Sequence, residues 1–141
     1  MNYLLYQFGC HRQHTRSGTV MKNILVIEDN ENMLSMMNDL LSRSEYHVIS
    51  ATDGVAGLKA YRTAKPDLVI TDIIMPNKEG LEVIMDLVKE TPRLKIIAMS
   101  GGGIMEPRTY LSLAEKLGAD EIIEKPFRPA DLLALVAKLL A

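Results

Sequence analysis

The stretch that most constrains the fold is LVITDIIMP, at residues 68–76. Its first four residues are apolar or β-branched, which is typical of a strand buried on both faces of a parallel sheet. Asp72 follows directly, and Pro76 and Gly80 then supply turn residues. Ligands bind beside the carboxyl ends of the strands in open α/β sheets, so Asp72 is a candidate functional residue. Taken alone, the same aspartate could equally cap a turn.

Short apolar runs alternate with amphipathic stretches along most of the chain. The runs predict five strands, at residues 24–27, 46–50, 68–72, 95–99 and 121–123. Apolar residues at helical spacing predict five helices, at residues 30–42, 54–65, 80–90, 107–117 and 129–140. Within the third helix, the residues expected to be buried are Leu81, Ile84, Met85 and Val88. Strands that alternate with helices through short loops indicate a doubly wound parallel α/β sheet with helices on both faces.

Composition argues against several classes of protein. At 141 residues the chain is long enough for one domain with a sizeable core. Its net charge of -2 gives no electrostatic reason to bind nucleic acid or a membrane surface. No apolar run approaches the ~20 residues of a membrane span. The lone Cys10 excludes an internal disulfide and fits a reducing compartment, so we expect a cytoplasmic protein.

Residues 1–20 differ in composition from the rest of the chain. Basic residues and histidines alternate there with small polar residues. We expect a flexible leader that is disordered or, if translation starts at Met21, absent from the natural protein. The folded domain is then expected at residues 21–141.

The carboxyl ends of all the strands meet at one edge in this architecture. The polar residues placed there are Glu28 and Asp29 after the first strand, Asp72 in the third, Ser100 after the fourth and Lys125 after the fifth. Each has an ordinary explanation by itself, because acids favour helix N-termini, serines cap turns and lysines are commonly solvated. Their joint placement is better explained by one shared site.

The chemistry of these groups points to phosphoryl transfer. Clustered carboxylates repel one another unless a cation compensates, and oxygen ligands of this kind suit Mg²⁺. An ammonium and a hydroxyl can hold phosphoryl oxygens. Asp72 would be the in-line nucleophile and would form an acyl phosphate. The glycine run at residues 101–103 would let the backbone approach a bound group closely.

The motifs at the strand ends resemble those of a known family. They are ILVIEDN at residues 24–30, DIIMP at residues 72–76, MSG at residues 99–101 and KPF at residues 125–127. From residue 22 to residue 140, the chain resembles the receiver domain of bacterial two-component response regulators, especially single-domain, chemotaxis-regulator-like receivers. The resemblance implies the flavodoxin-like strand order 2-1-3-4-5 and no output domain.

The resemblance also implies roles for the acids. Asp72 would accept a phosphoryl group from the phosphohistidine of a histidine kinase or a phosphotransfer protein. Asp29, with Glu28 nearby, would hold Mg²⁺ together with Asp72 and the backbone carbonyl of Ile74. Such a chain is a switch rather than an enzyme, because its only chemistry is its own phosphorylation and dephosphorylation.

Ser100 and Lys125 would contact the phosphoryl group, and the peptide bond from Lys125 to Pro126 is expected to be cis. One position departs from the family pattern. Receivers usually carry an aromatic residue three positions before this lysine, and Ile122 stands there. We therefore expect the signal to travel through residues 100–106 and the following helix rather than through an aromatic rotamer switch.

Two further expectations concern the phosphorylated form. Ile74 and Gly102 place no polar side chain beside the site that could position a water molecule, so loss of the phosphoryl group should be slow. The surface read by a partner is expected to combine residues 107–117, 121–123 and 129–140. That partner would be a kinase, a phosphotransfer protein, a motor or, in a homodimer, a second copy.

Three other interpretations compete with this one. A flavodoxin-like flavin carrier needs a phosphate cradle after the first strand, where the sequence EDNE at residues 28–31 would repel a phosphate. A haloacid-dehalogenase-type phosphatase would require a second acid at Ile74. A receiver that binds partners without ever being phosphorylated is disfavoured by the intact set of site residues, but it stays open as the alternative function.

Overall fold

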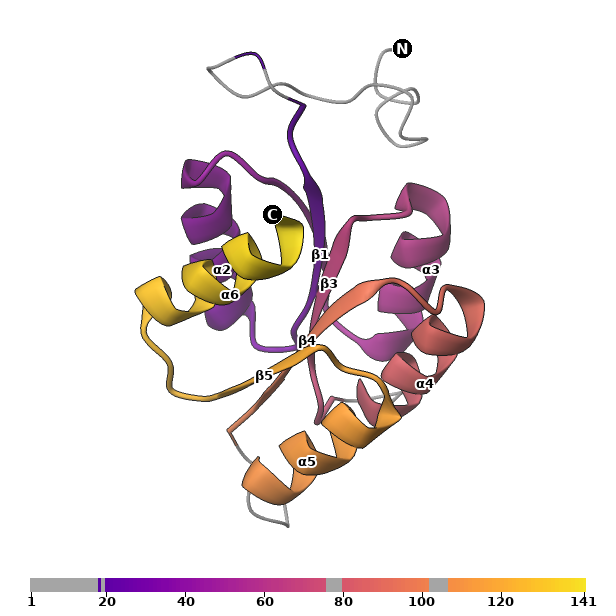
Figure 1. The fold of residues 1–141 in the computed structure, drawn as a ribbon. Helices are drawn as coiled ribbons and strands as arrows, with labels where there is room; N and C mark the ends of the chain where they lie inside the picture. Colours follow the sequence, from indigo (N-terminus) through magenta and orange to yellow (C-terminus); the bar gives the residue numbers. More distant parts are fainter. Residues whose placement is uncertain (1–17, 19, 76–79, 102–106) are drawn as a thin grey trace.

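The computed structural model describes residues 18, 20–75, 80–101 and 107–141 (Figure 1). The strands are β1 (Asn23–Ile27), β2 (His47–Ala51), β3 (Leu68–Asp72), β4 (Lys95–Ser100) and β5 (Glu121–Glu124). The helices are α2 (Glu31–Arg43), α3 (Gly54–Ala64), α4 (Gly80–Glu90), α5 (Pro107–Leu117) and α6 (Pro129–Leu140). The predicted elements are therefore confirmed, and no predicted end differs from the observed one by more than one residue.

One parallel sheet runs through the domain in the order β2-β1-β3-β4-β5. This confirms the predicted fold class and strand order. The chain builds outward from β1 in both directions, so the connections of β1 and β3 leave toward opposite faces of the sheet. A crevice forms outside the carboxyl ends of the strands at such a switch point. The topology therefore predicts that a site lies beside the ends of β1 and β3.

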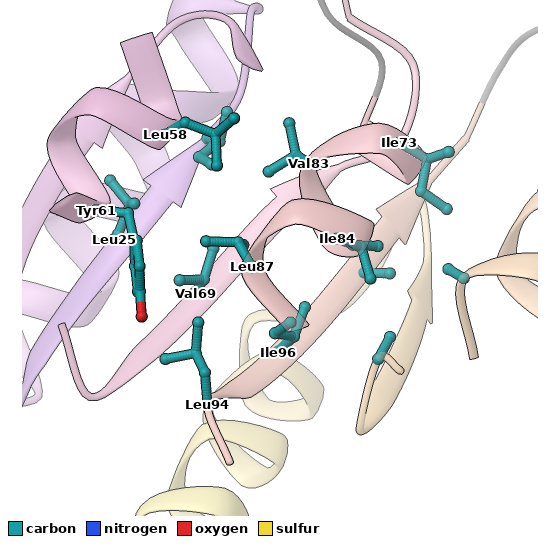
Figure 2. Close-up of a cluster of buried hydrophobic side chains, with 14 of the residues drawn as sticks. Leu25, Leu58, Tyr61, Val69, Ile73, Val83, Ile84, Leu87, Leu94 and Ile96 are labelled. Carbon is teal, nitrogen blue, oxygen red and sulfur yellow. The ribbon is translucent and has the colours of Figure 1, made fainter. Parts of the chain in front are cut away.

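Two apolar layers cover the sheet. Helices α3, α4 and α5 pack on one face, and α2 and α6 pack on the other (Figure 1). Figure 2 shows part of the first layer, in which Leu25 and Val69 of the sheet lie near Leu58 of α3 and Leu87 of α4. All five residues of β3 are buried, as expected for a central strand covered on both faces.

Side chains at the helix ends fix where the helices begin. The Asn30 side chain accepts the N–H of Met33 at 2.9 Å, and this starts α2 directly after the end of β1. The Asp53 side chain does the same for the N–H of Ala56 at 2.8 Å at the start of α3. Short connections of this kind keep the residues after each strand close to the sheet edge.

The predicted buried face of α4 was partly wrong. Met85 is 53% exposed, whereas Val83 and Leu87 are fully buried beside Ile84. The cause lies at Gly80, whose N–H donates to the carbonyl of Ile73 at 2.7 Å. Because this contact sets the rotation of the first turn, the buried stripe is centred one residue earlier than the apolar spacing alone suggested.

The predicted leader, residues 1–20, lies outside the described residues except for Gly18 and Val20. The glycine-rich loop, from Gly102 to Glu106, lies outside them too. Among the described residues, every helix is too short or too polar to cross a membrane.

Candidate functional site

The ends of four strands bring the predicted site residues together. Glu28 directly follows β1, Asp72 ends β3, Ser100 ends β4 and Lys125 directly follows β5. The pairing of β3 with β4 sets Asp72 beside Met99, and the pairing of β4 with β5 sets Ser100 beside Glu124. Residues far apart in the sequence therefore share one edge because the parallel register aligns their strand ends.

Backbone hydrogen bonds continue the sheet one residue past its regular strands. The N–H of Glu28 donates to the carbonyl of Ala51 at 3.0 Å, and the N–H of Lys125 donates to the carbonyl of Ser100 at 2.8 Å. Between them, the N–H of Ile73 donates to the carbonyl of Met99 at 3.0 Å. The backbone that carries the site is consequently held by the sheet rather than by a free loop.

Glu28, Asp29 and Asp72 form an acidic cluster. One carboxylate oxygen from each of the three lies within 4.8 Å of the others. The side chains of Glu28 and Asp72 are only 1% and 9% exposed, while Asp29 is exposed to solvent. Two acids are thus buried at the sheet edge and the third closes the cluster from the solvent side.

Lys125 supplies the cation of the cluster. Its Nζ donates to Oδ2 of Asp72 at 3.0 Å and also to Oε1 of Glu28. The peptide bond from Lys125 to Pro126 is cis, as predicted. A Cβ atom on Gly101 would lie 2.5 Å from Cβ of Lys125, so a larger residue at 101 would displace the lysine. The lysine stem therefore lies directly against the backbone that follows β4.

The electrostatics of the cluster follow from burial. Burial raises the pKa of Glu28 to about 7, the neighbouring Asp72 charge adds to this rise, and the bonds from Lys125 and from the N–H of Asn30 oppose it. Burial by itself lowers the pKa of Lys125, but its bonds with Glu28 and Asp72 prevail and raise it. The lysine is therefore charged, and one ammonium stands against three carboxyl groups.

The Ser100 hydroxyl is fully buried, and its oxygen has no hydrogen-bond partner among the described residues. An unpartnered buried hydroxyl normally costs about 1–3 kcal/mol, so such groups are rare unless a ligand or water uses them. The backbone carbonyl of Ser100 accepts the N–H of Lys125, at the same edge of the sheet as Asp72. Of all the polar atoms described at this edge, the Ser100 hydroxyl is the one most clearly available to a bound group.

The acidic cluster fits a magnesium ion. Mg²⁺ prefers oxygen ligands, usually one or two carboxylates with several waters and a phosphate oxygen. The three carboxyl groups of the cluster provide such oxygens within a small volume, and Lys125 alone leaves the group net negative. Burial is the main cause of the raised pKa of Glu28 and the nearby Asp72 charge adds to it, so a bound cation would favour the ionised carboxylates.

Ile74 and Ile122 are the two apolar residues that the sequence singled out near this cluster. The backbone N–H of Ile74 donates to Oδ1 of Asp72 at 3.4 Å, while a metal-binding role for its carbonyl stays a prediction. Ile122 lies on β5, half-buried against the layer formed by α3, α4 and α5. It also lines a cavity between α5 and β5.

Other residues that shape the site were not identified from the sequence. Thr71 is buried and its hydroxyl donates to the carbonyl of Asp72 at 2.9 Å. The N–H of Asn30 donates to Oε2 of Glu28 at 3.1 Å. A Cβ on Gly80 would lie 2.0 Å from the Asp72 carbonyl oxygen. Thr71 could have been noticed as a polar residue inside an apolar strand. The need for a glycine at position 80 could not, because it arises from a backbone contact that forms only in the folded chain.

Comparisons with known proteins agree with this geometry. A family model described as the response regulator receiver domain matches residues 24–137. The chemotaxis protein CheY of Thermotoga maritima is 33% identical over 118 residues, which cover 83% of this chain and 96% of that protein. The crystal structure of a response regulator receiver domain protein from Clostridium thermocellum has a TM-score of 0.79 at 30% identity, covering 85% of this chain and 94% of that one.

A longer relative matches in one part only. The alkaline phosphatase synthesis transcriptional regulatory protein PhoP of Bacillus subtilis is 34% identical over 119 residues, which cover 84% of this chain but 48% of PhoP. The chain thus spans about half the length of that regulator. Since the family model matches residues 24–137, which is most of the chain, the chain belongs to the response regulator receiver domain family of two-component systems.

Proposed function

We propose that this chain is a phosphorylation switch in which Asp72 accepts a phosphoryl group from the phosphohistidine of a histidine kinase or a phosphotransfer protein. One observation carries the proposal. The Asp72 carboxylate lies 3.0 Å from Nζ of Lys125, inside an acidic cluster that this one ammonium leaves net negative, at the same edge as a buried Ser100 hydroxyl that has no partner among the described residues. A nucleophile, a cation, a free hydrogen-bond donor and a metal-compatible acid group are the parts that phosphoryl transfer needs.

The proposed reaction exchanges one bond to phosphorus for another. A carboxylate oxygen of Asp72 attacks the phosphorus in line with the departing imidazole. The new oxygen–phosphorus bond makes an acyl phosphate, the nitrogen–phosphorus bond breaks, and the histidine of the donor keeps the electron pair. The donor therefore returns to its unmodified form, and one phosphoryl group moves to this chain.

Each of the other site residues has a separate task in this proposal. Mg²⁺ held by Glu28, Asp29 and Asp72 would neutralise negative charge on the phosphoryl oxygens. Lys125 would move from its bond with the free Asp72 carboxylate to a phosphoryl oxygen, because its flexible stem allows that displacement. The Ser100 hydroxyl, which bonds to none of the described residues, would donate a further hydrogen bond to the phosphoryl group.

Loss of the phosphoryl group is proposed to be slow. Ile74, two residues after the acceptor, carries a side chain that cannot hydrogen-bond a water molecule. Gly102, the other position considered in the sequence, lies outside the described residues. The prediction is a phosphorylated form that persists for minutes or longer, and a lifetime of seconds would contradict it.

The output of the switch is proposed to be a changed surface. Helix α5, strand β5 and helix α6 lie next to the Ser100 and Lys125 ends of the site, so a shift of either residue reaches them first. A partner protein or a second copy of the chain would read that surface. The chain would be a switch that catalyses only its own phosphorylation and dephosphorylation, and its cytoplasmic location stays a prediction from its single cysteine.

The direct test is intact mass spectrometry after incubation with Mg²⁺ and a small acyl-phosphate donor. The expected result is the gain of one phosphoryl group, which is lost in Asp72→Asn and in the presence of a chelator. Asp120→Asn is the matched control, because Asp120 is an acid at the opposite edge of the sheet and should not affect the gain. An absence of any gain in the folded wild-type chain would favour the unphosphorylated binding module instead.

A further inference from the structure

A cavity of about 490 Å³ lies at the amino edge of the sheet, the edge where the strands begin, between the ends of α3 and α4. Its floor is apolar and is formed by the buried residues Tyr61, Pro66 and Leu94. Figure 2 shows Tyr61 and Leu94 at the same end of the apolar layer. The rim is polar and is formed by Arg62, Lys65, Glu90 and Thr91. The volume lies within the range of binding pockets, which begin at about 300 Å³.

The rim is largely occupied by its own bonds. Nε of Arg62 donates to Oε1 of Glu90 at 2.9 Å, and the hydroxyls of Tyr61 and Thr91 share a hydrogen bond. Lys65 has no ion-pair partner among the described residues. The free ammonium at the rim therefore stands above an apolar floor.

The two helices decide which kind of group fits this cavity. Helices α3 and α4 end there, at Ala64 and Glu90, so both turn the negative ends of their dipoles toward it. An anionic ligand is disfavoured by these ends. An uncharged aromatic group suits the apolar floor, and its ring face attracts the ammonium of Lys65.

The chain enters β1 beside this cavity. The N–H of Asn23 donates to Oδ2 of Asp67 at 2.8 Å, and the N–H of Asp67 donates to the carbonyl of Asn23 at 2.8 Å. Pro66, which lines the floor, directly precedes Asp67. The residues before β1 therefore join the sheet next to the cavity.

The predicted leader contains an aromatic segment that the proposed switch does not use. The sequence YLLYQF at residues 3–8 has no charged residue, and it holds three aromatic residues in a chain with only five tyrosines and two phenylalanines. Apolar segments of this kind mark interaction sites when they are not covered. The eleven residues 9–19 span up to about 36 Å when extended, which is enough to bring the segment back to the start of β1.

We propose that this aromatic segment, residues 3–8, occupies the amino-edge cavity of its own chain, with Tyr6 and Phe8 on the floor. Side chains two residues apart face the same side of an extended segment, so the two rings can enter together. They would cover Tyr61 and Leu94, and the Tyr6 hydroxyl would remain at the polar rim. The proposal replaces the expectation of a flexible leader, and it does not depend on the phosphorylation switch.

The covalent link favours the same chain over a second copy. A short flexible linker gives an effective concentration of about millimolar, so a weak contact suffices within one chain. A second copy would have to exceed that concentration to compete.

The test is amide NMR of the full chain with a nitroxide spin label on Cys10, the only cysteine, which lies two residues after Phe8. Compared with the reduced label, the amide signals of Lys65, Thr91 and Leu94 should lose most of their intensity. His47 is the internal control, because its N–H donates to the carbonyl of Lys22 at 2.9 Å, on the other side of β1 from Asp67. A leader that is tethered without docking would weaken His47 and the cavity residues equally, which would overturn the proposal.

Two double variants of the labelled chain show which side chains dock. Tyr6→Ser/Phe8→Ser should remove the selective loss at the cavity. Leu5→Ser/Gln7→Ser is the matched control, because it changes the opposite side of the same segment and should keep the loss. Both variants should still gain a phosphoryl group from the acyl-phosphate donor. A selective loss that survives the first variant, or that disappears equally in both, would overturn the proposal.

Two further samples separate the possible occupants. In the first, a spin-labelled chain without ¹⁵N is mixed with a ¹⁵N-labelled Cys10→Ser chain, and signal loss at the cavity in this mixture would assign the segment to a second copy and overturn the proposal. In the other, a synthetic peptide of residues 1–12 is added to ¹⁵N-labelled Tyr6→Ser/Phe8→Ser at several times a millimolar concentration. The amides of Lys65, Thr91 and Leu94 should shift. No shift, or a shift centred on His47, would reject the cavity as the binding site.

Discussion

Acidic residues stand at both edges of the sheet, and they differ in what they bond. At the amino edge, Oδ2 of Asp67 accepts the N–H of Asn23 at 2.8 Å, while the N–H of Asp67 donates to the carbonyl of Asn23 at 2.8 Å. Asp120 forms the same two-way contact with Ile96, at 2.8 Å and 2.9 Å. These carboxylates complete the backbone pairing where β1 and β4 begin.

At the carboxyl edge, the acids accept backbone N–H groups too, but they also share one side-chain partner. Glu28 and Asp72 both accept from Nζ of Lys125, and burial, with the Asp72 charge adding to it, raises the pKa of Glu28 to about 7. A lysine can swing away on a flexible stem, but a backbone N–H cannot. A carboxylate that completes strand pairing therefore serves to hold the fold, whereas one that shares a single lysine with another acid remains available for chemistry.

The largest expected effect separates the two edges by function. Asp72→Ala should abolish phosphoryl gain while changing the free energy of unfolding by less than about 1 kcal/mol, because it removes a repulsive neighbour of Glu28 along with one lysine contact. Asp120→Ala should keep the phosphoryl gain but lower the free energy of unfolding by about 1–2 kcal/mol, because the N–H of Ile96 loses its acceptor.

Intact mass and denaturant unfolding on both variants check this contrast. The comparison would collapse if Asp120→Ala blocked phosphorylation in a folded chain. It would also collapse if Asp72→Ala lost as much stability as Asp120→Ala, since the Asp72 carboxylate would then hold the fold together just like the acids of the amino edge.

The second prediction concerns how firmly the backbone of the carboxyl edge is held. Gly80→Ala should lower the free energy of unfolding by about 3 kcal/mol, because the new Cβ would lie 2.0 Å from the Asp72 carbonyl oxygen and backbone cannot rotate away. Gly57→Ala is the control. Its Cβ would lie 2.5 Å from Cδ1 and 2.9 Å from Cγ1 of Ile27, a side chain that can shift where backbone cannot, and a gain in helix propensity of about 1 kcal/mol offsets part of the cost.

Thermal or urea unfolding of the two glycine variants measures the difference. Equal stability losses would mean that the Gly80 contact relaxes as easily as a side chain does. In that case the backbone of the carboxyl edge would be as adjustable as the side-chain contacts of Lys125, and no rigid backbone would hold the acidic cluster.

Strand ends could be predicted from the sequence, but the rotation of α4 at Gly80 could not. Strand ends could be predicted because apolar runs, caps and turns are local signals, and a parallel sheet then aligns Glu28, Asp72 and Lys125 automatically. The rotation of α4 could not be predicted, because it depends on contact between Gly80 and the backbone of Ile73 across a turn. Met85 was assigned to the core for this reason.

The bonds inside the site were equally beyond the sequence. Motifs named Glu28 and Asp29 as one acidic pair, yet the structure buries Glu28 and leaves Asp29 in solvent. Nothing local indicated that Lys125 would bridge Glu28 and Asp72, because side-chain pairing depends on burial and on distances between separate strands. The family pattern could say which residues matter, but the charge balance among them depends on burial and distances in the folded chain.

The third prediction concerns pH. The pKa of Glu28 is raised to about 7, so the carboxyl group holds a proton below that pH and loses it above. Protons therefore compete with Mg²⁺, and the apparent affinity for Mg²⁺ should rise about tenfold between about pH 6 and pH 8 before levelling off. Calorimetric titration at several pH values measures this. Glu28→Gln should bind more weakly with a flatter profile, and an unchanged pH profile in that variant would assign the proton to another group.

The smallest effects compare two buried hydroxyls at the same edge. Ser100→Ala removes a hydroxyl without a partner among the described residues, so the free energy of unfolding should rise by about 1 kcal/mol while phosphorylation slows roughly tenfold. Thr71→Val removes a hydroxyl that donates to the Asp72 carbonyl at 2.9 Å, so stability should instead fall by about 1 kcal/mol. Ser100→Thr keeps a hydroxyl and should restore most of the phosphorylation rate.

If Ser100→Ala were destabilising like Thr71→Val, the Ser100 hydroxyl would already be bonded in the free protein. It would then belong with the fold-holding groups of the amino edge rather than with the groups kept for a phosphoryl ligand.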